Sequence, residues 1–401
     1  MSVIGIVAEY NPFHFGHRHH ISEAKRQLGE DAPVVCVMSG DFVQRGEAAV
    51  YSKFARAEAA AMCGADLVLE LPLPWTRSSA EGFARGAVGL LGATGVVTHL
   101  SFGSECGEIE VLQTLAETLI DPLIGRDIRA ELQKDEGISF ALARSRAVAS
   151  RLGEMAQQLE MPNNILAVEY IKAIYEQGLS IKPMTERRFG SGHDEFSDGT
   201  RFKSAAELRS LISRGQDISA LIPEEACAVY KREEKLGRGP MTQGDLELAT
   251  LSRLRMLPDS AYAALPDSGE GLHNRICRAA KSEATLDAVL AASKSKRYAL
   301  SRIRRIMTCA CLGVTDGMAE GIPPYARVLA ATGRGREILR DMSHRSRIPI
   351  ITKPADVKSC SDDCRRIFAV CSAAHDFYVL GSDAVEERKG GSDWRTSPKM
   401  L

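Results

Sequence analysis

Two histidines flank a glycine near the start of the chain, in the stretch NPFHFGH at residues 11–17. An apolar run at residues 2–8 precedes this stretch and predicts a strand, and a helical pattern begins at Gly16. The free N–H groups at a helix N-terminus favour an anion, and glycine lets the backbone approach it closely. His14 and His17 can donate hydrogen bonds to phosphate oxygens and stabilise charge on a departing pyrophosphate. This pattern indicates a nucleotide-phosphate site.

Two other interpretations of the histidines are a metal site and a plain polar loop. The histidines nearest the turn are His14, His17, His19 and His20. They lack a carboxylate at a spacing suited to a shared metal ion. The close cysteine pairs are Cys309 with Cys311 and Cys360 with Cys364, and neither has a second pair at zinc-ribbon spacing. We therefore predict no metal site. A turn that follows the first strand of a parallel sheet favours phosphate over a polar loop.

The first half of the chain alternates apolar runs with helical patterns. The runs that predict strands cover residues 2–8, 32–40, 66–72, 96–105 and 180–189. Continuous apolar strands separated by helices are typical of a parallel sheet with helices on both faces. The prediction is an α/β fold with a Rossmann-like parallel sheet. Ligands bind beyond the carboxyl ends of the strands in such folds.

Strand signals fade in the second half. Residues 216–350 are predicted to be helical, residues 348–353 to form a strand, and the tail at 387–401 to be loose. A chain of 401 residues usually holds more than one core. We predict a Rossmann-like domain at 1–215 and a mainly α-helical domain at 216–401.

Composition excludes some classes of protein. The formal net charge of −1 and the 44% of hydrophobic residues are those of an ordinary globular protein, not of a uniformly basic one. The N-terminus has no basic region before an apolar core, and it carries Glu9. No later stretch approaches eighteen uninterrupted apolar residues. We therefore expect a cytoplasmic protein that does not bind membranes.

Several longer strings are similar to one known family. H-x-G-H after a first strand resembles the HIGH-motif nucleotidyltransferase superfamily. The strings GIVAEYNPFHFGH, MSGDFVQRGE, GADLVLELP, LSFGSE and PNNILAVEY resemble the tRNA(Met) cytidine acetate ligases within it. Similar stretches continue in order to about residue 355, so the resemblance covers most of the chain. It implies that the Rossmann-like sheet is of the nucleotidyltransferase type, that 1–215 is the nucleotidyltransferase and ATP-binding domain, and that 216–401 is the tRNA-binding domain. No Lys-Met-Ser-Lys-Ser sequence is present, which fits a ligase that is not an aminoacyl-tRNA synthetase.

The resemblance implies a reaction in two steps. Acetate attacks the α-phosphate of ATP, a co-substrate expected with Mg²⁺, and gives acetyl-adenylate and pyrophosphate. The N4 amine of the wobble cytidine in elongator tRNA(Met) then attacks the acetyl carbon. The products are N4-acetylcytidine and AMP. The implied partners are elongator tRNA(Met) and acetate, and no protein partner is implied.

The resemblance also implies a set of nucleotide-binding residues. They are Val7, Ala8, Glu9, Tyr10, Asn11, Pro12, Phe13, His14, Phe15, Gly16, His17, Arg18, His19, His20, Gly103, Asn164, Arg187, Arg188, Ser204 and Arg209. Either Arg187 or Arg188 is the arginine that contacts the nucleotide. Ser204 begins a predicted helix and resembles the serine of the superfamily's second phosphate motif. We predict His14, His17 and Asp41 as catalytic residues. Asp41 would orient the cytidine amine or take its proton, although it would equally suit a turn cap.

The second half carries the predicted RNA-binding residues. Nine basic and two acidic residues lie between residues 275 and 305, and a second basic cluster spans 327–347. Segregated charge of this kind favours an RNA surface. The predicted RNA contacts are Arg45, Lys294, Lys296, Arg297, Tyr298, Arg302, Arg305 and Arg327, with the ring of Tyr298 stacking on a base.

Two alternatives remain at this point. One is an adenylyl- or cytidylyltransferase acting on a small phosphorylated metabolite, with the helical half used for oligomerisation. The other is a tRNA-binding protein with a degenerate nucleotide fold. The basic clusters argue against the first alternative, and the intact set of His14, Gly16 and His17 argues against the second.

Overall fold

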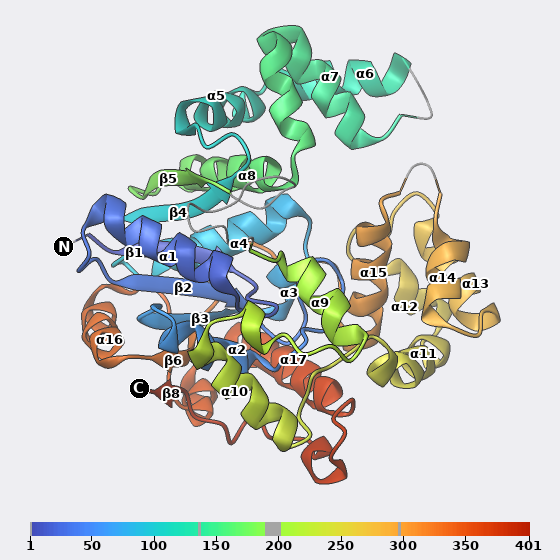
Figure 1. The fold of residues 1–401 in the computed structure, drawn as a ribbon. Helices are drawn as coiled ribbons and strands as arrows, with labels where there is room; N and C mark the ends of the chain where they lie inside the picture. Colours follow the sequence, from blue (N-terminus) through green and yellow to red (C-terminus); the bar gives the residue numbers. More distant parts are fainter. Residues whose placement is uncertain (1, 135–137, 189–201, 296–297) are drawn as a thin grey trace.

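A computed structural model describes residues 2–134, 138–188, 202–295 and 298–401. Within these residues an eight-stranded sheet has the order β5-β4-β1-β2-β3-β6-β7, and β8 pairs with β6 (Figure 1). The strands are β1 (Ile4–Ala8), β2 (Val34–Ser39), β3 (Leu67–Leu71), β4 (His99–Ser104), β5 (Lys182–Arg187), β6 (Ala326–Ala331), β7 (Ile350–Ile351) and β8 (Lys399–Met400). The first five strands are parallel to one another, whereas β6 runs antiparallel to its neighbour β3. The predicted Rossmann-like parallel sheet is confirmed.

Helices cover both faces of this sheet (Figure 1). Those that alternate with the first strands are α1 (Phe15–Leu28), α2 (Lys53–Met62), α3 (Leu73–Thr76) and α4 (Ala80–Ala93). In β2, Val35 and Val37 belong to the core shared with α4, whereas Val34, Cys36 and Met38 belong to the core shared with α1 and α2. Successive side chains of a strand point to opposite faces, so a strand buried on both sides is apolar throughout.

Two groups of helices extend from the sheet (Figure 1). The first comprises α5 (Ile109–Ile120), α6 (Ile124–Lys134), α7 (Phe140–Leu152) and α8 (Pro162–Glu176). The second comprises α11 (Glu247–Met256), α12 (Asp259–Ala263), α13 (Leu272–Ser282), α14 (Leu286–Ser293) and α15 (Leu300–Leu312). Between the groups, α9 (Ala205–Ser213) and α10 (Glu224–Lys235) cross the front of the sheet in Figure 1.

The last quarter of the chain returns to the sheet. β6 is buried along its whole length and lies next to β3, and it is followed by α16 (Gly333–Arg345) and α17 (Asp362–Val379). β6 was predicted as helix because its alanine-rich sequence has a weak strand signal. The sheet therefore crosses the predicted boundary at residue 215. The division into a nucleotide domain and a tRNA domain stays a prediction about function.

The C-terminal tail is ordered, so the prediction of a loose tail was wrong. Lys399 and Met400 pair with Ala330 and Ala331 of β6. Asp393 is completely buried and accepts a hydrogen bond from Arg327. These contacts hold the tail against β6, a strand more than sixty residues earlier in the chain. In the described part of the chain, no helix is both long and apolar enough to cross a membrane.

Candidate active site

A pocket of about 220 Å³ lies at the carboxyl ends of β1, β4 and β5. Its lining residues are His14, Gly16, His17, His19, His20, Gly103, Glu105, Asn163, Glu186, Arg187, Arg188, Phe202, Lys203 and Ser204. The parallel sheet brings these residues together, because the carboxyl ends of its strands meet at one edge. Nine of the twenty predicted nucleotide-binding residues, drawn from four separate segments of the chain, thus lie around one cavity.

Hydrogen bonds orient the two histidines of the HIGH-like turn. His14 caps the N-terminus of α1, and its Nδ1 accepts a hydrogen bond from the N–H of Gly16 at 3.0 Å. His17 Nδ1 accepts one from the N–H of His14 at 3.3 Å. A neutral imidazole has one N–H, so a ring whose Nδ1 accepts carries its proton on Nε2. Both Nε2–H groups remain as donors to a ligand.

Three imidazoles of the pocket, those of His14, His17 and His20, are neutral at pH 7. Burial, followed by the charges of Arg188 and Arg209, lowers the pKa of His14 to about 3. Burial and the neighbouring Arg188 likewise lower the pKa of His20 to about 3. The pKa of His17 is well below its usual value, again mainly through burial. The positive charge that acts on these three histidines therefore comes mainly from Arg188, while the three rings supply neutral hydrogen-bond donors.

Gly103 makes room for Arg188. A Cβ placed on Gly103 would lie 2.7 Å from Cγ of Arg188, which is closer than carbon atoms approach without a shift. The N–H of Arg188 donates to the carbonyl of Ser104 at 2.9 Å, which fixes where this residue leaves β5. Arg187 instead places its Cβ against Gly107. Of the two predicted arginines, Arg188 is the one whose charge acts on the histidines.

Asn164 is buried beneath the pocket rather than lining it. Its Oδ1 accepts hydrogen bonds from the N–H groups of Glu105 and Cys106 at 2.8 and 3.2 Å. The neighbouring Asn163 lines the pocket, and its Nδ2 donates to Glu105 at 2.7 Å. Asn164 therefore holds the turn after β4, and Asn163 is the asparagine that lines the pocket. A nucleotide contact of Asn164 stays a prediction.

Ser204 caps the N-terminus of α9, and Arg209 lies in the middle of that helix. The hydroxyl of Ser204 caps the helix by accepting the N–H of Glu207 at 3.2 Å, and Ser204 lines the pocket. Arg209 Nη1 donates to the carbonyl of Asn11 at 2.9 Å. Arg209 thus supports the loop that precedes His14, and its charge reaches that histidine.

The remaining residues of the predicted stretch from Val7 to His20 shape the loop. Tyr10, Asn11 and Phe13 are buried, and the N–H of Phe13 donates to the hydroxyl of Tyr230 at 2.9 Å. The side chain of Arg18 forms an ion pair with Glu225 at 2.5 Å. These side chains hold the backbone beneath the pocket, whereas the pocket lining within this stretch comes from histidine and Gly16.

Some lining residues escaped the sequence predictions. They are Glu105, Asn163, Glu186, Phe202 and Lys203. Lys203 and Phe202 directly precede the predicted Ser204, so their position before a helix start was an available signal. The sequence did not single out Glu186. Side chains of a strand alternate between the two faces of the sheet, and the sequence of β5 does not show which face lies toward the pocket. Burial raises the pKa of Glu186 to about 7, and its Oε2 is buried without a hydrogen-bond partner among the described residues.

Comparisons with known proteins agree over the whole chain. A family model described as HIGH Nucleotidyl Transferase matches residues 1–393. A tRNA(Met) cytidine acetate ligase of Syntrophomonas wolfei is 37% identical, with 99% of each chain covered, and one of Acetivibrio thermocellus is 34% identical, with 98% of each covered. The chain belongs to the tRNA(Met) cytidine acetate ligase family. The crystal structure of Thermotoga maritima TmcAL bound with alpha-thio ATP matches with a TM-score of 0.92, 36% identity and complete coverage of both chains.

Asp41, a predicted catalytic residue, does not line the pocket of this acetate ligase family member. Its Oδ2 lies 2.8 Å from Nδ1 of His375, and its Oδ1 accepts the N–H of Lys53 at 2.7 Å. Burial opposes its ionisation, but His375 and Lys53 hold the pKa of Asp41 below its usual range. Its contact with the cytidine amine stays a prediction, against which this burial argues.

Arg327 was predicted to contact RNA, and the structure corrects this. It is 2% exposed and pairs with Asp393 at 2.7 Å and with Glu70 at 3.2 Å. Lys53 contacts the same two carboxylates at 2.9 Å each. An arginine in a buried strand must be neutralised by such partners. Arg327 is therefore part of the interior of this ligase family fold and is closed to RNA.

The other predicted RNA contacts of this family member differ in exposure. Arg45 and Lys294 are exposed, whereas Tyr298 is 8% exposed, with the Arg302 guanidinium 5.2 Å from its ring centre. Arg305 pairs with Asp267 at 3.7 Å. Lys296 and Arg297 lie outside the described residues. Tyr298 thus has little free ring surface for stacking. The second basic cluster lies around α16, across the molecule from α15 (Figure 1).

The carboxylates of the pocket are poorly suited to hold a metal ion. The carboxylate of Glu105 accepts hydrogen bonds from the backbone N–H and the side-chain Nδ2 of Asn163 and from the backbone N–H of Asn164. Within the described ranges, no group of three or more His, Cys, Asp or Glu side chains is arranged around a common metal position.

Proposed function

We propose that this chain activates acetate with ATP and acetylates the wobble cytidine of elongator tRNA(Met). An acetate oxygen attacks the α-phosphorus of ATP, and the bond to pyrophosphate breaks. The N4 amine of cytidine then attacks the acetyl carbon of the acetyl-adenylate. The bond to AMP breaks, N4 loses a proton, and N4-acetylcytidine is the product. The family membership of the chain supports this reaction.

The observation that carries the proposal is the pair of neutral histidines at the N-terminus of α1. Each Nδ1 accepts a backbone N–H, so each neutral ring carries its proton on Nε2 and would donate it to phosphate oxygens as pyrophosphate leaves. Gly103, Arg188 and Ser204 lie around the same pocket, and they would hold the nucleotide and its outer phosphates. Mg²⁺, where required, would enter on the phosphates of ATP.

RNA would approach from the side of the pocket that carries the second helical group. Arg45 follows β2 at the same sheet edge as the histidines, and it is exposed. Lys294 is an exposed cation at the end of α14. Exposed cations of this kind would contact the phosphate backbone, and they would make binding weaken as salt increases.

One assay tests the proposal. The protein is incubated with ATP, radiolabelled acetate and total tRNA, and the tRNA is then digested to nucleosides. Label in N4-acetylcytidine is the expected result. His17→Ala should abolish acetate-dependent ATP–pyrophosphate exchange and leave tRNA binding intact. Folded protein that exchanges pyrophosphate but leaves its own tRNA unlabelled would refute the proposed acceptor.

The two alternatives lose ground for separate reasons. A transferase for a small phosphorylated metabolite would not require the second helical group, yet the ligase relatives match along their full length. A tRNA-binding protein with a degenerate nucleotide site would not retain an intact and oriented histidine pair. In the assay, the first alternative would release pyrophosphate only with its own metabolite, and the second would release none.

A further inference from the structure

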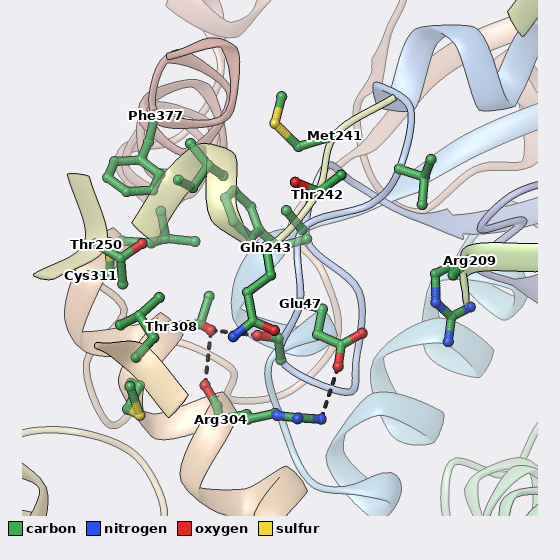
Figure 2. A pocket seen from close by; sticks show the side chains of 18 of the residues that line it. Glu47, Arg209, Met241, Thr242, Gln243, Thr250, Arg304, Thr308, Cys311 and Phe377 are labelled. Atoms are coloured by element: carbon green, nitrogen blue, oxygen red, sulfur yellow. Dashed lines mark hydrogen bonds and ion pairs between the residues drawn. The ribbon is translucent and has the colours of Figure 1, made fainter. Parts of the chain in front are cut away.

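A second pocket, also of about 220 Å³, lies between the sheet and the second helical group. Figure 2 shows its lining, which comes from the loop after β2, from α9 and α17, and from α11, α14 and α15. Its apolar walls include Phe42, Met241, Leu290, Met307 and Phe377. The nucleotide reaction described above uses none of these walls. The pocket is therefore a candidate for a different part of the substrate.

Polar groups gather along one side of this second pocket. Gln243, Glu47, Arg304 and Thr308 lie together in Figure 2, apart from Phe377 and Met241. Arg304 Nη1 pairs with Glu47 at 2.9 Å. The hydroxyl of Thr308 donates to the carbonyl of Gly46 at 3.0 Å, which ties α15 to the loop after β2. The pocket thus combines flat apolar walls with one hydrogen-bonding side.

The second pocket adjoins the loop that carries the catalytic histidines. Arg209 lines it and also donates to the carbonyl of Asn11 at 2.9 Å. Val50 lines it too, and its N–H donates to Oδ1 of Asn11 at 2.8 Å. Asn11 precedes His14 by three residues. One layer of side chains therefore separates this pocket from the loop at the proposed reaction centre.

We infer that the second pocket receives one unstacked nucleobase of the substrate RNA, from a nucleotide that flanks the target cytidine. This inference rests on the proposed function. A nucleobase has two apolar faces and a hydrogen-bonding edge, which matches the apolar walls and the polar side. Proteins that read single-stranded loops splay bases out and hold them in this manner. Arg304 and Arg209 supply cations near the path of the RNA backbone.

The pocket can be filled without touching the nucleotide site. Thr250, on α11, lines the pocket and is partly exposed, so Thr250→Trp would occupy the space of a base. Leu248 lies on the same helix, is 82% exposed and does not line the pocket, so Leu248→Trp is a matched control. Thr250→Val removes the hydroxyl without filling the cavity. Thr250→Trp should lower kcat/KM for tRNA at least about tenfold, and the two controls should not.

A double-mutant cycle identifies the base. Anticodon stem-loop RNAs carry an abasic nucleotide at one loop position other than the target cytidine, and each is acetylated by wild type and by Thr250→Trp. At one flanking position the two losses should not add, because both remove the same contact. Thr250→Trp that behaves like Leu248→Trp, or losses that add at every position, would overturn the inference.

Two further measurements keep the test decisive. Acetate-dependent ATP–pyrophosphate exchange in wild type tests the proposed function itself. If wild type shows no exchange, the proposed function is refuted, and this outcome is distinct from failure of the base-pocket inference alone. If Thr250→Trp does not give the circular dichroism of the folded protein, Ala48→Phe fills the pocket from the opposite wall. A small apolar molecule that binds there and leaves RNA acetylation unchanged would also contradict a base pocket.

Discussion

The imidazole rings of His14 and His17 stack with their centres 3.8 Å apart and their planes 27° apart. Two protonated rings at this distance would repel each other, but burial and nearby arginines hold both pKa values below the ordinary range. The pair is thus a neutral donor unit beside a positive arginine cluster. Its geometry depends on backbone N–H groups that occupy each Nδ1.

Gly16 is required for this geometry. A Cβ at Gly16 would lie 2.9 Å from Cε1 of His14, so Gly16→Ala should push the ring from its capping position. We expect acetate-dependent pyrophosphate exchange to fall by about a hundredfold, as when one transition-state donor is lost. Gly125→Ala is the control, because a Cβ there meets nothing within 4 Å. Equal activity of both variants would mean that the ring position is unimportant.

Arg188 and Arg187 should differ in their effect on ATP binding. Arg188 lies against Gly103 and acts on the histidines, whereas Arg187 packs on Gly107. Losing a hydrogen bond to a charged group costs about 1.5–3 kcal/mol, so Arg188→Ala should raise the KM for ATP by roughly ten- to a hundredfold. Arg187→Ala should raise it less. Steady-state exchange kinetics measure both, and the reverse order would contradict this assignment.

Glu186 should make ATP binding depend on pH. Burial and then the charge of Glu23 raise its pKa to about 7, and Arg188 acts in the opposite direction. Above that pH the ionised carboxylate repels the triphosphate, so the KM for ATP should rise between about pH 6 and pH 8. Glu186→Gln should flatten this profile. Glu23→Gln removes a carboxylate outside the pocket lining. In this variant the KM for ATP should still rise near neutral pH.

The same group predicts the direction of a stability change. The folded pKa of Glu186 lies above the unfolded value, so the folded state binds more protons between the two values. The contribution of Glu186 to the free energy of unfolding is fully present below the unfolded pKa, and it is lost as the pH rises through the folded pKa of about 7. Urea unfolding at pH 5 and pH 8 should therefore show a smaller fall in stability for Glu186→Gln than for wild type. If wild type and Glu186→Gln lose the same free energy of unfolding between pH 5 and pH 8, the loss comes from other groups.

Lys53 holds together a buried set of carboxylates. Its Nζ lies 2.9 Å from both Glu70 and Asp393 and 4.0 Å from Asp41. Removing one partner from a buried ion pair costs about 3–5 kcal/mol, so Lys53→Met should lower the free energy of unfolding by that amount. Urea unfolding followed by circular dichroism measures it.

Asp41→Asn separates a structural role of Asp41 from a catalytic one. A structural role predicts lower stability with acetyl transfer retained in the folded fraction. Loss of transfer at unchanged stability would restore the catalytic role predicted from the sequence.

The sequence alone determined the nucleotide half of this protein. The apolar runs before and after NPFHFGH predicted a parallel sheet, and the position of His14, Gly16 and His17 after the first strand predicted a phosphate site. Both patterns are local, because strand periodicity and a helix start are written in consecutive residues. The strings around them carried the family resemblance that the comparisons confirmed.

Only the tertiary structure decided which polar residues face a ligand. Arg327 and Asp41 resemble functional residues in the sequence, yet both lie in a buried network that a tail residue, Asp393, completes. Glu186 resembles an ordinary strand residue, yet it lines the pocket proposed to bind ATP. Burial and ion pairing depend on contacts between segments hundreds of residues apart, and no local pattern records them. The phosphate site was therefore predictable from the first strand and its turn, and the reaction from the family resemblance, whereas the division between interior and site required the fold.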